Sequence, residues 1–243
     1  MINVKVKIHT PFFEVGVKNY LYGDDVLQLA KAADAAAIKY DIDVLFLAPY
    51  ADIRRVAENT EKLIVFAPYM DVLYPGRGMA DVLPESVKAA GAKGVVLNHC
   101  ERPMTLSNLR KSISRARELE LLSFVCADTI EETKAVAQLH PDIINPEQSD
   151  KIGKGGEIDA QYIRESIHAV KDIDPNIIVE QAAGIQSGED VYRCIYMGAE
   201  GVGAASGVCN SQNPCKMVEE MIRNVRLAYE NMRKKGDTLY HVV

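Results

Sequence analysis

The chain has 243 residues, of which 48% are apolar and 26% are charged, and this composition excludes collagen-like, low-complexity and disordered chains. Its 28 basic and 34 acidic residues give a formal net charge of −6, so the surface as a whole repels nucleic acid and anionic membranes, and we expect neither as a partner. The length suffices for one domain with a large core, because barrels of ~200–250 residues commonly form a single domain.

Short apolar runs of strand length alternate with longer segments of helical periodicity along the whole chain. The predicted strands cover residues 12–18, 43–47, 63–66, 94–98, 122–126, 142–145, 177–180 and 201–203. The predicted helices cover residues 25–39, 50–58, 84–90, 106–118, 130–138, 159–172, 188–197 and 214–234. Ser187 is a predicted N-cap for the helix that follows it. The alternation predicts eight βα units.

Eight βα units in a chain of this length match a (β/α)8 TIM barrel, whereas an open doubly wound sheet usually has five or six strands. No GxGxxG sequence follows the first predicted strand, and the glycine-rich run GVGAASG at residues 201–207 has the wrong spacing for a dinucleotide fingerprint. We therefore expect an α/β protein whose residues 1–243 form a single TIM-barrel domain, with a short C-terminal tail from about residue 233.

The sequence contains no predicted membrane span and no predicted metal site. Its longest uncharged apolar stretch, residues 44–51, is far shorter than the ~20 residues that a span needs. The N-terminal sequence MINVKVKIHTPFFEV lacks the apolar core of a secretory signal, so we expect a cytoplasmic protein. The five cysteines form no CxxC pair and the five histidines form no close-spaced ligand motif, which indicates reduced thiols and no metal.

Chemistry-bearing residues follow several predicted strands, at the end of a barrel where active sites lie. Lys18 follows the first strand, the run Asn98-His99-Cys100-Glu101-Arg102 follows the fourth, and Glu147 follows the sixth. A lysine, a histidine and a carboxylate suffice to move a proton next to a carbonyl group. The loops IGKGG, GIQSG and AASG expose backbone N–H groups that can bind a phosphate.

Each of these residues also has an ordinary structural interpretation. His99 could be a core or surface histidine, Glu147 a solvated loop carboxylate, and Lys18 a surface charge. The pair Glu101-Arg102 is most simply a surface ion pair, which contributes little stability. The glycine-rich loops gain weight only as a set on consecutive units, because glycine is common in βα loops.

Longer motifs in the chain resemble the triosephosphate isomerase family, and in particular its shorter archaeal type. The resemblance covers nearly the whole length. It depends on VKNY around Lys18, VLPESVKAAGAKGVVLNHCER up to Arg102, FVCAD around Cys126, NPEQSDKIGKG around Glu147, AAGIQSGEDV at residues 182–191 and GVGAASGV at residues 201–208. The blocks NHCER and AGIQSGEDV, in that order and spacing, are the most specific.

The resemblance implies a sugar-phosphate isomerase of glycolysis and gluconeogenesis that works without a metal or an organic cofactor. It implies that Glu147 removes the proton beside the carbonyl, that His99 donates a hydrogen bond to the substrate oxygen, and that Lys18 stabilises the enediolate. It also implies that Glu101 orders the surroundings of these residues. A mobile lid would include Ile152 and residues 153–155, and the backbone amides of three residues would bind the phosphate: Gly184, Ala205 and Ser206.

Four departures from the family pattern, at six positions, leave the substrate open. Gly16 stands where the family has an asparagine. The replacement removes one hydrogen bond to the substrate, worth about 2.7–4 kcal/mol by analogy with oxyanion-hole donors. It also leaves space for a longer substrate. Met79 and Ala80 replace a Thr-Gly in the third loop, which the family uses to support the lysine from the partner subunit. Cys100 replaces a serine, and Gln148-Ser149 replaces two prolines.

These observations leave three functions to compare. The first is interconversion of dihydroxyacetone phosphate and D-glyceraldehyde 3-phosphate. The second is the same chemistry on a larger ketose phosphate, such as a tetrulose phosphate. The third is a phosphate-ligand binding barrel with little activity, since a fold does not guarantee a function. The family leads us to expect a homodimer or homotetramer.

Overall fold

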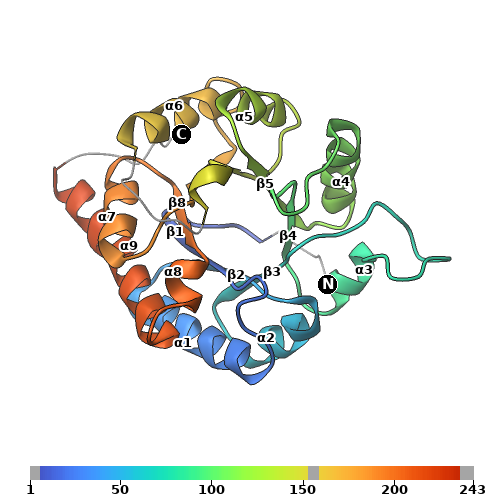
Figure 1. Ribbon diagram of the computed structural model, residues 1–243, viewed down its shortest axis with the longest axis horizontal. Helices are drawn as coiled ribbons and strands as arrows, with labels where there is room; N and C mark the ends of the chain where they lie inside the picture. Colours follow the sequence, from blue (N-terminus) through green and yellow to red (C-terminus); the bar gives the residue numbers. More distant parts are fainter. Residues whose placement is uncertain (1–5, 153–158, 236–243) are drawn as a thin grey trace.

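The computed structural model describes residues 6–152 and 159–235, in which eight parallel strands close into one barrel with helices around it (Figure 1). The predicted TIM barrel and its single domain are therefore confirmed for the described chain. The strands are β1 (Phe12–Gly16), β2 (Val44–Leu47), β3 (Leu63–Ala67), β4 (Gly94–Leu97), β5 (Leu122–Ala127), β6 (Ile143–Pro146), β7 (Ile178–Gln181) and β8 (Gly201–Ala204). Each strand pairs with its sequence neighbours, and β1 closes the ring by pairing with β8.

The outer layer contains the predicted helices with small changes at their ends. They are α1 (Asp24–Tyr40), α2 (Ile53–Asn59), α3 (Pro84–Ala89), α4 (Leu106–Glu118), α5 (Ile130–Ala137), α6 (Ala160–Lys171), α7 (Gly188–Tyr196) and α9 (Pro214–Lys235). The helix predicted for residues 50–58 divides into a 3-10 turn, η1 (Tyr50–Asp52), and α2. A second turn, η2 (Ser149–Lys151), and the short helix α8 (Ser206–Cys209) were not predicted. Ser187 caps α7 as predicted, and together with Asp190 it forms a capping box.

The first predicted strand was too long at its C-terminal end. The prediction ran to residue 18, but β1 ends at Gly16, and Lys18 has a backbone φ of +47° in the left-handed region. Non-glycine residues adopt this conformation infrequently because of steric contact with Cβ. The chain therefore turns sharply at Lys18 as it leaves the barrel.

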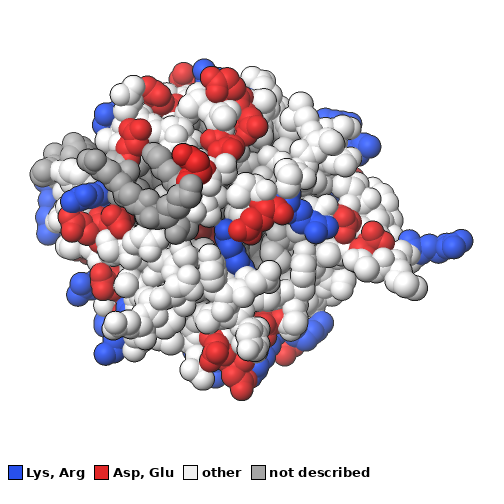
Figure 2. Space-filling model, in the orientation of Figure 1, with Lys and Arg blue, Asp and Glu red and all other residues white. Residues whose placement is uncertain are grey.

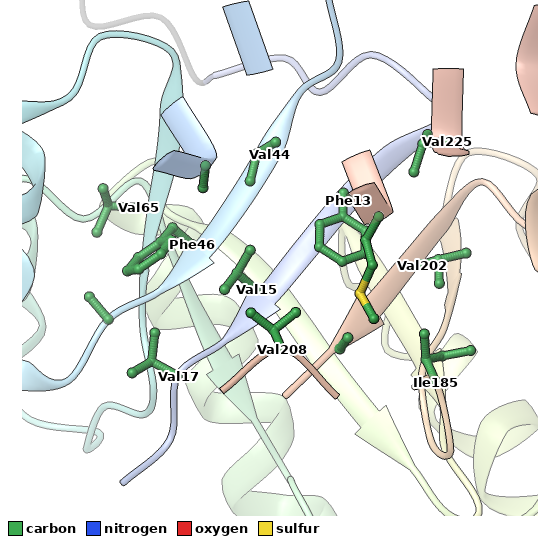
Figure 3. Packing of buried hydrophobic residues seen from close by; sticks show 14 of the residues in the cluster. Phe13, Val15, Val17, Val44, Phe46, Val65, Ile185, Val202, Val208 and Val225 are labelled. Carbon is green, nitrogen blue, oxygen red and sulfur yellow. The ribbon is translucent and has the colours of Figure 1, made fainter. Parts of the chain in front are cut away.

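Side chains of β1 alternate between the two faces of the barrel wall, as the period of two in a strand requires. Phe13 and Val15 face outward and pack in the cluster between the strands and the outer helices, with Val202 of β8 and Val225 of α9 (Figure 3). Phe12 faces inward and packs in the apolar interior of the barrel, which is lined by Ile8, Leu45, Ile64, Phe66, Val96, Leu122, Phe124, Cys126 and Ile143.

Glycines in two strands make room for aromatic rings inside the barrel. A Cβ on Gly201 would lie 2.2 Å from the Phe12 ring, and a Cβ on Gly94 would lie 2.2 Å from the Phe66 ring. Such distances are far below van der Waals contact, so these rings fill the interior only because the facing positions carry no side chain. On β1, the next inward-facing residue toward the C-terminal end is the buried Glu14.

A buried ion pair joins α6 to the start of β8. Lys171 Nζ lies 2.7 Å from Glu200 Oε2, and it also donates hydrogen bonds to the carbonyl oxygens of Pro175 and Ile177. The same Glu200 oxygen accepts a hydrogen bond from the N–H of Val179. Both charges are thus paired in spite of their burial.

Two predicted features extend beyond the described residues. The lid residues 153–155 lie outside them. The tail expected from residue 233 begins inside α9, which ends at Lys235, and residues 236–243 also lie outside the described part. No helix in the described residues is long and apolar enough to cross a membrane. On the face shown in Figure 2, acidic and basic side chains are interspersed.

Candidate active site

A pocket of about 390 Å³ opens where the C-terminal ends of the strands meet. All nine residues predicted for the site line this pocket: Gly16, Lys18, His99, Glu101, Glu147, Ile152, Gly184, Ala205 and Ser206. They come from the ends of β1, β4, β6, β7 and β8. Contribution from several different strands is typical of active sites in (β/α)8 barrels.

Lys18 forms an ion pair with Glu101 at the mouth. Its Nζ donates a hydrogen bond to Glu101 Oε1 at 3.2 Å. Burial acts to lower the pKa of Lys18, but the charge and hydrogen bond of Glu101 and the charge of Glu147 outweigh it, so the net effect is a raised pKa. Lys18 is therefore a fixed positive charge beside the pocket.

His99 is held with one defined nitrogen available as a donor. The backbone N–H of Glu101 donates to His99 Nδ1 at 3.1 Å, so Nδ1 must be unprotonated and the neutral ring carries its hydrogen on Nε2. Burial, together with the charge of Lys18, lowers the pKa of His99, which favours the neutral ring. The Nε2 atom lies 3.6 Å from Glu147 Oε2. An electrically neutral hydrogen-bond donor thus faces the carboxylate across the pocket.

The loop that carries His99 is anchored by its neighbour Asn98. The side-chain Nδ2 of Asn98 donates to the carbonyl oxygen of Cys126 at 3.0 Å, and its Oδ1 accepts the N–H of Met104 at 2.9 Å. Asn98 has a φ of +57°, which asparagine tolerates better than most residues. The local sequence therefore fixes the turn that brings His99 over the pocket.

Glu147 follows β6 directly, and its side chain is only 10% exposed. Burial raises the pKa of its carboxyl, and this effect is partly offset by the charge of Lys18 and by a hydrogen bond from the N–H of Ala183. The backbone N–H of Glu147 donates to the carbonyl oxygen of Ala127 at 2.8 Å, which fixes the residue relative to β5. A poorly solvated carboxylate with a raised pKa is suited to act as a base.

The loops after β7 and β8 pack closely together at the other side of the pocket. A Cβ on Gly207 would lie 2.3 Å from the carbonyl oxygen of Ile185, so only glycine fits there. This contact brings Gly184 close to Ala205 and Ser206, and all three border the pocket. Ile152, which directly follows η2, also borders it, next to the residues that the structure does not describe.

The four departures from the family pattern have distinct surroundings. A Cβ on Gly16 would lie 3.0 Å from Glu14 Oε1 and 3.3 Å from the Cβ of Ala205. Met79 is 94% exposed at the protruding loop between β3 and α3. Ser149 donates from its N–H and its hydroxyl to the two carboxylate oxygens of Asp128, both at 2.7 Å, so hydrogen bonds hold the chain where the family has prolines. Cys100 lies 3.8 Å from His99 Nδ1.

Two buried polar residues of this pocket, Glu14 and Asn145, were not predicted as site residues from the sequence. Both are buried and line its inner end. The signal for Glu14 was present in the sequence FFEVG, because a residue two positions before Gly16 in a strand shares its face. Asn145 precedes Glu147 by two residues and was predicted as the last residue of a strand but not as a site residue, and the structure places it in β6.

The fold and the pocket define a single (β/α)8 barrel with a lysine, a histidine and a glutamate gathered at its C-terminal mouth. The chain belongs to the triosephosphate isomerase family, since the family model described as triosephosphate isomerase matches residues 13–221. It is 34% identical to the triosephosphate isomerase of Methanothermus fervidus over 82% of this chain and 91% of that protein. The same identity holds for the enzyme of Sulfolobus acidocaldarius, over 89% and 93%, and for that of Sulfurisphaera tokodaii, over 93% and 99%.

Proposed function

We propose that this protein interconverts dihydroxyacetone phosphate and D-glyceraldehyde 3-phosphate. The observation that carries the proposal is the meeting of Lys18, His99 and Glu147 around one pocket, in a member of this isomerase family. Isomerisation of a hydroxy carbonyl compound needs a base, a hydrogen-bond donor at the carbonyl oxygen and a positive charge near the developing enediolate.

Each of the three residues has one step in the proposed mechanism. The Glu147 carboxylate removes a proton from the carbon beside the carbonyl and returns it to the neighbouring carbon. The Nε2–H of His99 donates a hydrogen bond to the two substrate oxygens between which the remaining proton moves. The ring does so as a neutral imidazole and not as a charged imidazolium. The Lys18 ammonium group stabilises the negative charge that develops. The reaction transfers only protons, so the proposal requires neither a metal nor an organic cofactor.

The phosphate end of the substrate would lie against the loops after β7 and β8. We propose that the backbone amides of Gly184, Ala205 and Ser206 bind it, and that Ile152 belongs to a segment that covers it. Glu101 would act through Lys18 and His99, which it contacts, and not on the substrate itself.

The test is a coupled assay of D-glyceraldehyde 3-phosphate turnover by the protein and its Glu147→Gln variant. We expect the variant to lose about 10²–10⁴-fold in kcat, because glutamine fills the same space but cannot accept the proton. Glu58→Gln, an exposed carboxylate on α2, is the matched control and keeps full turnover. Equal rates for the protein and Glu147→Gln would show that Glu147 is not the base.

A larger ketose phosphate is the second candidate substrate. The observation that favours it is Gly16, which lines the pocket beside Glu14 without the side chain that the family has at this position. Both candidates use the same proton transfer, so the Glu147→Gln control applies to both.

We also propose that the protein forms a homodimer or homotetramer through the loop between β3 and α3. This loop projects from the barrel (Figure 1) and exposes apolar side chains at Val72, Tyr74 and Met79. Exposed apolar side chains gathered in one place are typical of interaction surfaces. The cytoplasmic location stays a prediction from the sequence.

A further inference from the structure

The inner end of the pocket contains buried carboxyl and amide oxygens that lack hydrogen-bond partners. Glu14 is 6% exposed and Asn145 is 4% exposed, and both line the pocket. Glu14 Oε1 and Asn145 Oδ1 have no hydrogen-bond partner among the residues that the structure describes. Leaving a buried oxygen unpaired costs free energy comparable to a lost hydrogen bond. Such atoms in a pocket indicate that a polar group of a ligand forms the missing hydrogen bonds.

A second carboxyl group lies behind Glu14. Both oxygens of Glu180 also lack a partner within the described chain. A Cβ on Gly203 would lie 2.2 Å from Glu14 Oε2 and 2.7 Å from Glu180 Oε1, so the two carboxyl groups approach the same point. We call Glu14, Asn145 and Glu180 the polar floor. Glu14 and Asn145 line the pocket together with Lys18, His99 and Glu147, whereas Glu180 is fully buried beside Glu14 and does not itself line the pocket.

The two carboxyl groups of the polar floor favour the protonated state. Burial, with the charge of Glu147 added, raises the pKa of Glu14. Burial, with the charge of Glu14 added, raises the pKa of Glu180. Two close carboxyl groups with little solvent cannot both ionise readily. A protonated carboxyl both donates and accepts hydrogen bonds, which matches the hydroxyl group of a sugar.

Two glycines give the polar floor its space. A side chain at Gly203 would collide with both carboxyl groups, and a side chain at Gly16 would contact Glu14 Oε1. Glu14 and Gly16 are on β1, Glu180 is on β7, and Gly203 is on β8, so three neighbouring strands contribute to one arrangement. The replacement of the family asparagine by Gly16 therefore coincides with a buried carboxyl at the same place.

We propose that the polar floor is a subsite for a hydroxymethyl group carried by the reacting carbon that lies farther from the phosphate. This inference deepens the proposed function and rests on it. The loops proposed to bind the phosphate border one side of the pocket, and Glu14 and Asn145 line its inner end, so we place the additional carbon at the end of the substrate farther from the phosphate. The substrate class is then a 2-ketose 1-phosphate with at least one carbon more than a triose, of which tetrulose 1-phosphate is the simplest.

The reaction on this class needs no other reactant. Glu147 takes the proton from C3 of the tetrulose 1-phosphate, and the electron pair of that C–H bond forms the C2=C3 double bond of the enediolate. The proton on the C3 oxygen passes to the C2 oxygen, and Glu147 returns its proton to C2. The carbonyl has moved from C2 to C3, and the product, numbered from its other end, is a tetrulose 4-phosphate.

The experiment compares kcat/KM for tetrulose 1-phosphate and dihydroxyacetone phosphate, followed by deuterium incorporation from heavy water. We expect the ratio of kcat/KM for tetrulose 1-phosphate to kcat/KM for dihydroxyacetone phosphate to be above one for the unaltered protein. The ratio falls by about 10- to 100-fold in Glu14→Leu, which removes the hydrogen-bonding group. Glu14→Gln, which retains the shape and part of the hydrogen bonding, gives an intermediate ratio and remains informative if Glu14→Leu folds poorly. Glu58→Gln, the control, keeps the ratio of the unaltered protein.

A binding measurement separates this inference from the proposed function. In the Glu147→Gln background, calorimetry gives the Kd of each sugar phosphate with Glu14 present and with Glu14→Gln added. We expect Glu14→Gln to raise the Kd of tetrulose 1-phosphate by a factor about tenfold larger than the factor by which it raises the Kd of dihydroxyacetone phosphate. Equal weakening of the two ligands, or equal kcat/KM ratios in all Glu14 variants, would overturn the subsite even if triose turnover is intact. Absence of turnover on both substrates would overturn the proposed function, and the Kd comparison would still decide the subsite.

Discussion

Glu101 connects two residues of the site through two different groups of its own. Its carboxylate accepts a hydrogen bond from the Lys18 ammonium group, and its backbone N–H donates a hydrogen bond to His99 Nδ1. The carboxylate therefore affects the charge of Lys18, while the backbone fixes the tautomer of His99 whatever the side chain is. Substitution of the Glu101 side chain separates these two effects.

We predict that Glu101→Gln moves the alkaline limb of the kcat/KM profile to lower pH. The pKa of Lys18 is raised in the folded protein, so its positive charge is lost only as pH rises above the usual range. Without the Glu101 carboxylate this loss begins at a lower pH. At pH 7 we expect a decrease of about fivefold, because the hydrogen bond is kept but loses its charge on one side. An alkaline limb that does not move would show that Glu101 does not support the charge of Lys18.

Single residues at strand ends could be predicted because a barrel brings all C-terminal strand ends together. The positions of Lys18, His99 and Glu147 thus followed from the order of βα units and the family motifs. The polar floor could not be predicted, because Glu14 and Glu180 are far apart in sequence and meet only when β1, β8 and β7 are adjacent. The collision that requires Gly203 is likewise visible only in three dimensions.

At the scale of elements, the Lys171–Glu200 pair ties α6 to the β7–β8 region. We predict that Lys171→Met lowers the Tm by roughly 10 °C, because it leaves the Glu200 carboxylate buried without its partner. The measurement is thermal unfolding followed by circular dichroism. The double variant Lys171→Met with Glu200→Gln should recover part of this loss, since glutamine has no charge and still offers an oxygen to the N–H of Val179. A single variant as stable as the unaltered protein would contradict the prediction.

The predicted strands and long helices agree with the structure because their signals are periodic over many residues. The short helix α8 was not predicted, because its four residues are too few to show a helical period. The end of β1 was misplaced because Val17 and Lys18 continue the alternation of the strand, although the backbone already turns at Lys18.

At the scale of the whole molecule, the loop between β3 and α3 is a firmly anchored projection. At its base, the backbone N–H of Asp71 donates to the carbonyl oxygen of Val82, and the N–H of Val82 donates to the Asp71 carboxylate. The buried Arg115 of α4 donates to the carbonyl oxygen of Leu73, and its guanidinium lies 4.1 Å from the centre of the Tyr74 ring. The exposed apolar side chains are thus presented on a supported loop.

We predict that Met79→Asp weakens self-association and raises the dissociation constant by about tenfold or more, because it removes the burial of one large apolar side chain and adds a charge. Size-exclusion chromatography with light scattering, over a range of protein concentrations, measures the change. Ile38→Asp on the outer face of α1 is the control for added charge and should leave the mass unchanged. An unchanged mass for Met79→Asp would place the contact elsewhere.

The closed strand order has a consequence for aggregation. Every one of the eight described strands has a partner on both sides, with β1 and β8 sealing the ring. A sheet with an unpaired edge can recruit a strand from another chain and grow into fibrils, whereas a closed barrel offers no such edge. Among the described residues no strand edge is therefore free for intermolecular pairing, and the barrel must open at a pair of strands before these strands can pair with another chain.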